Sequence, residues 1–287
     1  MHYKEAKSLL TNWNSINIYR GCTHGCIYCD SRSTCYQFNH AFEDIEVKKN
    51  ADELLESILK RKRNKCMIST GSMSDPYMPI ENELKLTRKC LEIIDKYGFG
   101  ATIITKSDLI LRDLDLLKSI NKKSKCVVQM TMTTYDEELC KKLEPNVCTT
   151  KRRFEVLKIL HENNIPTIVW LTPILPFITD TKENINGILD YCIQANVKGI
   201  ICFSMGMTLR EGSREYYYKK LDKIYPGIKE KYQKHYGNSY NITSKHNKDL
   251  MDIFKKTCKQ HGMIYNPYEC FKYTSEFEEK SNQLTLF

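Results

Sequence analysis

Short apolar runs alternate with longer amphipathic segments along most of the chain. Runs rich in Ile, Val and Thr that are apolar throughout are typical of parallel strands buried on both faces. We predict six such strands, over Ser15–Tyr19, Cys66–Thr70, Ala101–Thr105, Cys126–Thr131, Thr167–Leu171 and Gly199–Phe203. The segments between them repeat apolar residues at helical spacing. They predict helices over Asp52–Arg63, Leu84–Tyr97, Asp108–Ile120, Lys151–Asn163 and Thr181–Ala195.

The alternation of strand and helix predicts an α/β fold with a parallel sheet and right-handed crossovers. Six units are fewer than an eight-stranded barrel requires, so an open partial barrel and a doubly wound sheet both fit. Either arrangement places ligand sites at the carboxyl ends of the strands. After about Ser213 the pattern changes to two longer helical segments, Ser213–Tyr236 and Ser244–Gly262, and then a polar tail. We expect the α/β domain over residues 1–212, a helical extension over 213–274 and a flexible tail over 275–287.

Composition is that of a soluble globular protein, with 41% hydrophobic and 28% charged residues. No apolar run is long enough for a membrane span, and the amino-terminal residues lack the apolar core of a secretory signal. We therefore expect a cytoplasmic protein with no membrane partner. The net charge of +9 suits a polyanion such as nucleic acid without requiring one.

Thirteen cysteines stand out in this composition. Most are isolated in apolar stretches and are expected to be small buried side chains in a reducing compartment. Three form the cluster Cys22-Thr-His-Gly-Cys26-Ile-Tyr-Cys29, directly after the first predicted strand. A short loop with this C-x3-C-x2-C spacing can bring three thiolates onto one iron–sulfur cluster and leave one iron open. A structural zinc site, with His24 or Cys35 as fourth ligand, is the alternative.

This spacing on the first loop of a six-fold strand–helix pattern resembles the radical S-adenosylmethionine (radical SAM) superfamily. The resemblance implies a partial (β/α)6 TIM-type barrel whose cofactors are a [4Fe–4S] cluster and S-adenosylmethionine. It further implies cleavage of S-adenosylmethionine to a 5′-deoxyadenosyl radical, with a flavodoxin or ferredoxin as reductant. Cys22, Cys26 and Cys29 would be the metal ligands.

Further motifs resemble the DNA repair photolyase-like family, the relatives of spore photoproduct lyase. They are Gly71-Ser-Met-Ser-Asp75-Pro-Tyr77 with Leu86-Thr87-Arg88, Thr105-Lys106-Ser107, Leu143-Glu144-Pro145 and Thr172-Pro173-Ile174-Leu175-Pro176. The resemblance implies a lyase-like reaction on DNA, at a damaged pyrimidine. One departure is Asp30-Ser31-Arg32, because members of this family often carry an aromatic residue and then Ala-Arg after the third cysteine.

Polar residues at the predicted strand ends are candidates for cofactor binding. They are Gly71, Ser72, Ser74, Asp75, Lys106, Ser107, Thr131, Thr133 and Pro173. Local turns and backbone caps are the alternative role for such residues. Cys126 and Cys140, with Cys35, are candidate hydrogen-atom donors, and a buried, inert thiol is the alternative that the sequence favours for each one.

The chain ends in an apolar segment after a polar stretch, with Gln283, Leu284, Leu286 and Phe287 at the positions of interest. The segment resembles the pentapeptide by which bacterial replication and repair proteins bind the sliding clamp, a docking mode in which an extended peptide fills a groove. The alternative is that the tail packs on its own domain.

Together these features predict a radical SAM enzyme that acts on DNA. A radical modification of RNA, a peptide or a metabolite is the competing enzymatic hypothesis. A clamp-associated iron–sulfur binding protein without radical chemistry is the alternative of another class.

Overall fold

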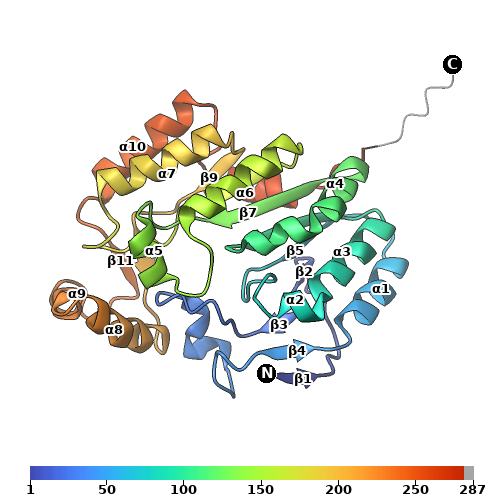
Figure 1. The fold of residues 1–287 in the computed structure, drawn as a ribbon, viewed down its shortest axis with the longest axis horizontal. Coiled ribbons are helices and arrows are strands. Elements are labelled where there is room, and N and C mark those ends of the chain that lie inside the picture. Colours follow the sequence, from blue (N-terminus) through green and yellow to red (C-terminus); the bar gives the residue numbers. More distant parts are fainter. Residues whose placement is uncertain (281–287) are drawn as a thin grey trace.

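A six-stranded parallel sheet forms the centre of the molecule in the computed structural model, which describes residues 1–280 (Figure 1). Its strands are β2 (Ser15–Ile16), β5 (Met67–Thr70), β6 (Gly100–Thr105), β7 (Cys126–Thr131), β8 (Thr167–Trp170) and β9 (Gly199–Ile201). They are hydrogen-bonded in this order, and every pair is parallel. The order of neighbours follows the chain, as in a barrel of repeated strand–helix units. The predicted partial (β/α)6 barrel is therefore confirmed.

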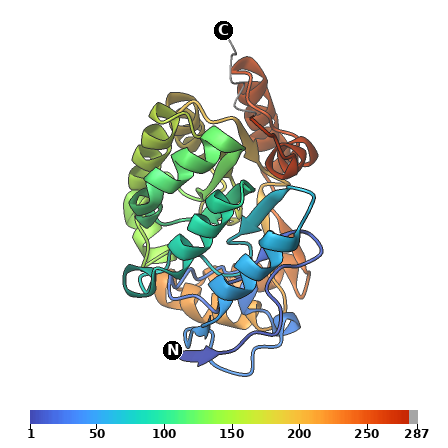
Figure 2. The same cartoon turned by 90° about the vertical axis from the view of Figure 1, so that its right-hand side faces the viewer.

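Amphipathic helices cover the outer face of this sheet (Figures 1 and 2). They are α1 (Ala51–Arg61), α3 (Leu86–Lys96), α4 (Leu114–Lys123), α6 (Thr150–Glu162) and α7 (Lys182–Gln194). Each buries one apolar stripe, such as Val156, Leu157 and Leu160 of α6. All five predicted helices are present, but the segment predicted from Asp108 begins with the 3-10 helix η3 (Asp108–Asp113) before α4.

The first predicted strand, Ser15–Tyr19, is wrong in one respect. Only β2 joins the barrel, whereas β3 (Tyr19–Arg20) pairs antiparallel with β4 (Glu46–Lys48). β4 also pairs with β1 (His2–Lys4), which makes a separate three-stranded sheet. Ile16, Ile18 and Tyr19 are all buried, and periodicity cannot reveal a bend inside a run that is buried throughout.

The carboxyl-terminal part differs more from the prediction. The segment Ser213–Tyr236 forms two helices, α8 (Ser213–Ile224) and α9 (Ile228–Tyr236), because Pro226 cannot continue a helix and Gly227 adopts a φ of 88°. The next helix is α10 (Asn247–Gln260). Besides β1 and β4, the elements not predicted are α2 (Glu81–Leu84), α5 (Glu137–Leu143), β10 (Gly206–Thr208), β11 (Asn241–Thr243), α11 (Pro267–Ser275) and two 3-10 helices, η1 (Asp30–Arg32) and η2 (Thr34–Tyr36). Among residues 1–280, no helix has the length and apolar character that crossing a membrane would require.

Candidate active site

The three clustered cysteines lie on the loop between β3 and η1. Gly21 begins this loop with a φ of 96°, and a Cβ there would lie 2.4 Å from the carbonyl oxygen of Phe42. The Cys22 amide donates to that same oxygen at 3.1 Å, and the Ile27 amide donates to the Leu143 oxygen at 3.0 Å. The loop is thus fastened on one side to the segment before β4 and on the other to the end of α5.

A cavity of about 810 Å³ opens at the carboxyl ends of the barrel strands. Its wall contains all three clustered cysteines, together with six of the predicted cofactor-binding residues, namely Gly71, Ser72, Asp75, Lys106, Thr131 and Pro173. β10 and β11 complete the wall. The structure therefore brings together residues from four barrel strands and from the cysteine loop at the edge where the fold predicts a ligand site.

The cysteine side chains suit an iron–sulfur cluster better than a mononuclear metal ion. Burial raises the pKa of Cys22 to about 12 and that of Cys26 well above its ordinary value, and a bound metal would favour the thiolate form of both. A single zinc ion would hold its sulfur ligands about 4 Å apart. Among residues 1–280, the ligand atoms that all lie within 4.8 Å of one another belong to His2, His40 and Asp44 instead. No fourth cysteine lines the part of the cavity that the structure describes, so three thiolates would leave one iron open.

Asp75 links the cysteine loop to the ends of two strands. Its carboxylate accepts hydrogen bonds from Thr105 Oγ1 at 2.7 Å and the Lys106 amide at 2.8 Å, and it lies 3.1 Å from His24 Nε2. Burial alone would raise the pKa of Asp75, but the charge and hydrogen bond of His24 and the donors from Lys106 and Thr105 hold it at about 2. Asp75 was a predicted cofactor-binding residue, but its pairing with His24 could not be predicted from the sequence, because only the fold brings the two side chains together.

A fully buried ion pair between Arg153 and Glu144 lies beside the cavity. Arg153 also donates to the carbonyl oxygens of Lys106 at 3.2 Å and Thr131 at 3.0 Å, which are the ends of β6 and β7. The hydroxyl of Tyr28, in the cysteine loop, donates to Glu144. The sequence did not predict that Arg153 and Tyr28 both bind Glu144. Only Glu144 stood out there, as part of the motif Leu143-Glu144-Pro145.

Three predicted cofactor-binding residues lie outside the cavity. Ser74 is buried, Ser107 caps η3 by accepting from the Leu109 amide at 3.2 Å, and Thr133 donates to Glu144 at 3.2 Å. Of the three, Ser107 has the local capping role that was the alternative interpretation for such residues.

The candidate hydrogen donors are also outside the cavity wall. Cys126 begins β7, about 16 Å along the strand from Thr131 at roughly 3.3 Å per residue, and its pKa is raised by burial. Cys140 is buried on α5 beside Glu144. Cys35 is exposed, and its sulfur lies 3.2 Å from Nη1 of Arg210, which lines the cavity. The tail residues Gln283, Leu284, Leu286 and Phe287 lie outside the described residues.

Aromatic and basic side chains share the rim of the cavity. Trp170 and Phe203 line it from the ends of β8 and β9, and their rings form a cluster with Phe271 of α11. Phe203 remains 58% exposed. Arg210 also lines the cavity, and it donates to Tyr240 Oη at 2.7 Å.

Comparisons with known proteins identify the family of the part of the chain that contains the three cysteines. The sequence profile of the Radical SAM superfamily matches residues 16–192. An uncharacterized protein of Methanocaldococcus jannaschii is 38% identical over 169 residues, which cover 58% of this chain and 62% of that protein. An uncharacterized protein of Mycobacterium tuberculosis is 26% identical over 228 residues, or 77% of this chain and 66% of that one. The chain thus spans less than two thirds of the length of these relatives.

The fold is similar to that of spore photoproduct lyase complexed with dinucleoside spore photoproduct. The two structures superpose with a TM-score of 0.64 over 92% of this chain and 80% of the lyase. Their sequences are 14% identical, so the likeness establishes the fold alone.

Proposed function

Because this chain belongs to the radical SAM superfamily, whose enzymes use a [4Fe–4S] cluster and S-adenosylmethionine, we propose that Cys22, Cys26 and Cys29 hold the cluster and that the substrate is DNA. When bound, these cofactors supply hydrogen-atom abstraction from an unactivated carbon. Family membership favours an enzyme over a clamp-associated protein with a purely structural cluster. The reaction we propose is the repair or modification of a damaged pyrimidine.

The residues of the chain position the cofactors. Asp75 holds His24 and the end of β6, and so fixes the turn that carries Cys22 and Cys26. The strand-end residues Gly71, Ser72, Lys106, Thr131 and Pro173 line the same cavity as the three cysteines and would offer backbone and side-chain polar groups to S-adenosylmethionine. Ser107 would act behind them through the turn it caps, and Thr133 through its hydrogen bond to Glu144.

The observation that carries the DNA proposal is the combination of aromatic rings and a guanidinium in the wall of one cavity. Nucleobases stack on aromatic side chains, and arginine pairs with phosphate. Trp170, Phe203 and Arg210 all line the cavity, and Phe203 is 58% exposed. A base swung out of a duplex could stack there while its backbone stays outside, and damage lowers the free energy needed to unstack it. The net charge of +9 and the shared fold with spore photoproduct lyase are consistent with this substrate.

Binding of DNA that carries a pyrimidine lesion, measured against salt concentration, tests the proposal. We expect Phe203→Ala to weaken binding by about tenfold, because loss of one stacked base costs roughly 1–3 kcal/mol. Arg210→Gln should lower the slope of log affinity against log salt by about one. Trp13→Ala is the matched control, because Trp13 is 90% exposed and lies before β2, at the opposite end of the sheet. Equal binding by the Phe203 variant and wild type, or binding to RNA alone, would contradict the proposal.

A further inference from the structure

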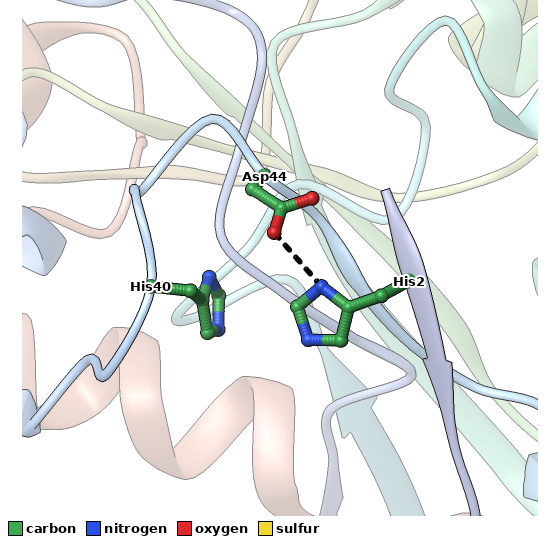
Figure 3. A group of neighbouring side chains, drawn as sticks. All are labelled: His2, His40 and Asp44. Carbon is green, nitrogen blue, oxygen red and sulfur yellow. Dashed lines mark hydrogen bonds and ion pairs between the residues drawn. The ribbon is translucent and has the colours of Figure 1, made fainter.

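A second group of metal-binding side chains lies outside the cavity. His2 of β1 faces Asp44 with its Nδ1 3.0 Å from Oδ2, and His40 comes from the same loop as Asp44, between η2 and β4 (Figure 3). One ligand atom from each of the three residues lies within 4.8 Å of the others. The His2 and His40 rings meet edge to face, with centroids 4.8 Å apart. β1 and the loop before β4, which are far apart in sequence, thus bring two imidazoles and one carboxylate close together.

His40 is arranged as a metal-binding histidine would be. Its Nδ1 lies 2.9 Å from the carbonyl oxygen of Ala41, so this nitrogen carries the proton and Nε2 carries the lone pair. Nε2 is buried and has no hydrogen-bond partner within residues 1–280. A histidine that donates one N–H to a backbone carbonyl and leaves the other nitrogen free is the usual arrangement around bound metal ions. An ordinary ion pair between His2 and Asp44 would not account for this unpartnered nitrogen.

The charges around the three side chains are mixed, because two carboxylates there each pair with an ammonium group. The buried carboxylate of Glu46 lies 3.9 Å from His2 Nε2, although it also pairs with Lys4 at 3.2 Å. The second oxygen of Asp44 faces the Met1 amino group at 2.6 Å. About two fifths of the side-chain surfaces of His2 and Asp44 are exposed, with values of 40% and 39%, so an ion could enter directly from solvent.

We propose that His2, His40 and Asp44 form a separate site for a borderline divalent ion of the Zn²⁺ class. Two imidazoles and a carboxylate are a donor set that such ions favour, with water completing the coordination. In a tetrahedral zinc site the ligand atoms are about 3.3 Å apart, so ligand atoms that lie within 4.8 Å of one another need to close by no more than about 1.5 Å.

This site would support the cysteine loop without touching it. The ion would tie the loop that contains His40 and Asp44 to β1. The same loop contains Phe42, whose carbonyl oxygen accepts a hydrogen bond from the Cys22 amide and packs against Gly21. Ion binding would therefore hold the segment against which the cysteine loop is fastened.

Zinc content of the untagged full chain, with its iron–sulfur cluster reconstituted so that the clustered thiols are occupied, tests the proposal. After equilibration with zinc chloride and desalting, we expect wild type to retain about one more zinc ion per chain than His40→Phe, measured by plasma mass spectrometry. Phenylalanine keeps the ring packing and the His2–Asp44 pair but has no lone pair. His261→Phe, at the exposed end of α10, is the matched control and should retain as much zinc as wild type.

Iron content measured in the same samples separates loss of zinc from loss of folding. Zinc should also raise the unfolding temperature of wild type and leave that of His40→Phe unchanged. If His40→Phe does not load iron, His40→Gln takes its place, with the same expectation. Equal zinc retention by wild type and the folded His40 variant would overturn the proposal. So would retention of no zinc by wild type.

Discussion

Arg153 and Glu144 show how much of the site depends on single buried side chains. Their ion pair connects the ends of β6 and β7 to the Tyr28 hydroxyl, and so connects the barrel to the cysteine loop. Glu144 was visible in the sequence as part of a family motif, but nothing in the pattern of residues identified its partner. The pairing depends on how α5 and α6 pack, which local periodicity does not encode.

Replacing Glu144 by Gln should destabilise the chain strongly, because it leaves the Arg153 guanidinium buried without a counter-charge. Removing one partner of such a pair costs about 3–5 kcal/mol of the free energy of unfolding. Urea unfolding of the chain before cluster reconstitution measures the loss. The matched control is Glu138→Gln, which breaks the surface pair with Lys141 and should change stability little. A similar effect of both variants would show that the buried pair does not hold the fold together.

At the level of elements, the sequence predicted the parts of the chain with strong periodicity. All six barrel strands and their five covering helices are present, because fully apolar runs and amphipathic stripes report burial directly. Although α11 has nine residues, most of the elements it missed are short: β10 and β11 have three residues each, and α2 has four. Such elements are set by tertiary pairing, because they are too short to show a period.

Gly71 marks the end of β5, where the chain turns into the cavity. An alanine Cβ there would lie 2.0 Å from the carbonyl oxygen of Ile104 in β6, and φ is 97°. Gly71→Ala should therefore combine left-handed backbone strain with a displacement of β6. Gly98→Ala is the matched control, since Gly98 also has positive φ but no atom within 4 Å of the added Cβ.

We expect Gly98→Ala to lower the free energy of unfolding by about 1 kcal/mol, from strain alone, and Gly71→Ala to lower it by at least twice as much. Iron retained after reconstitution should fall in Gly71→Ala and stay normal in Gly98→Ala. Equal stability of the two variants would mean that β5 and β6 can separate at this point without loss.

For the whole molecule, the predicted fold indicated which edge of the sheet carries the site. It did not indicate which other segments complete the wall of the cavity. Six of nine predicted cofactor-binding residues line the cavity with the three cysteines. Arg210, Tyr240 and Ile242 also line it, and they come from the part of the chain around β10 and β11 that the sequence described only as a change of pattern. Residues that close a cavity need to suit its ligand, so they do not follow the periodic pattern of apolar residues that marks strands and helices.

Binding of the apolar tail to a sliding clamp remains a prediction. A peptide that contains Gln283, Leu284, Leu286 and Phe287 should bind a bacterial sliding clamp, because its leucine and phenylalanine side chains can fill an apolar groove. Leu286→Ala with Phe287→Ala should abolish binding in a fluorescence-anisotropy titration, whereas Thr285→Ala should not. Unchanged binding by the double variant would exclude docking through these side chains.

The most direct test of the account is the formation of 5′-deoxyadenosine. The reconstituted chain would be reduced with dithionite under anaerobic conditions in the presence of S-adenosylmethionine, with and without DNA that carries a pyrimidine lesion. We predict that wild type forms 5′-deoxyadenosine, that lesion-containing DNA increases the yield, and that Cys26→Ala forms none. Absence of 5′-deoxyadenosine from wild-type protein with a full complement of iron and sulfide would contradict the account.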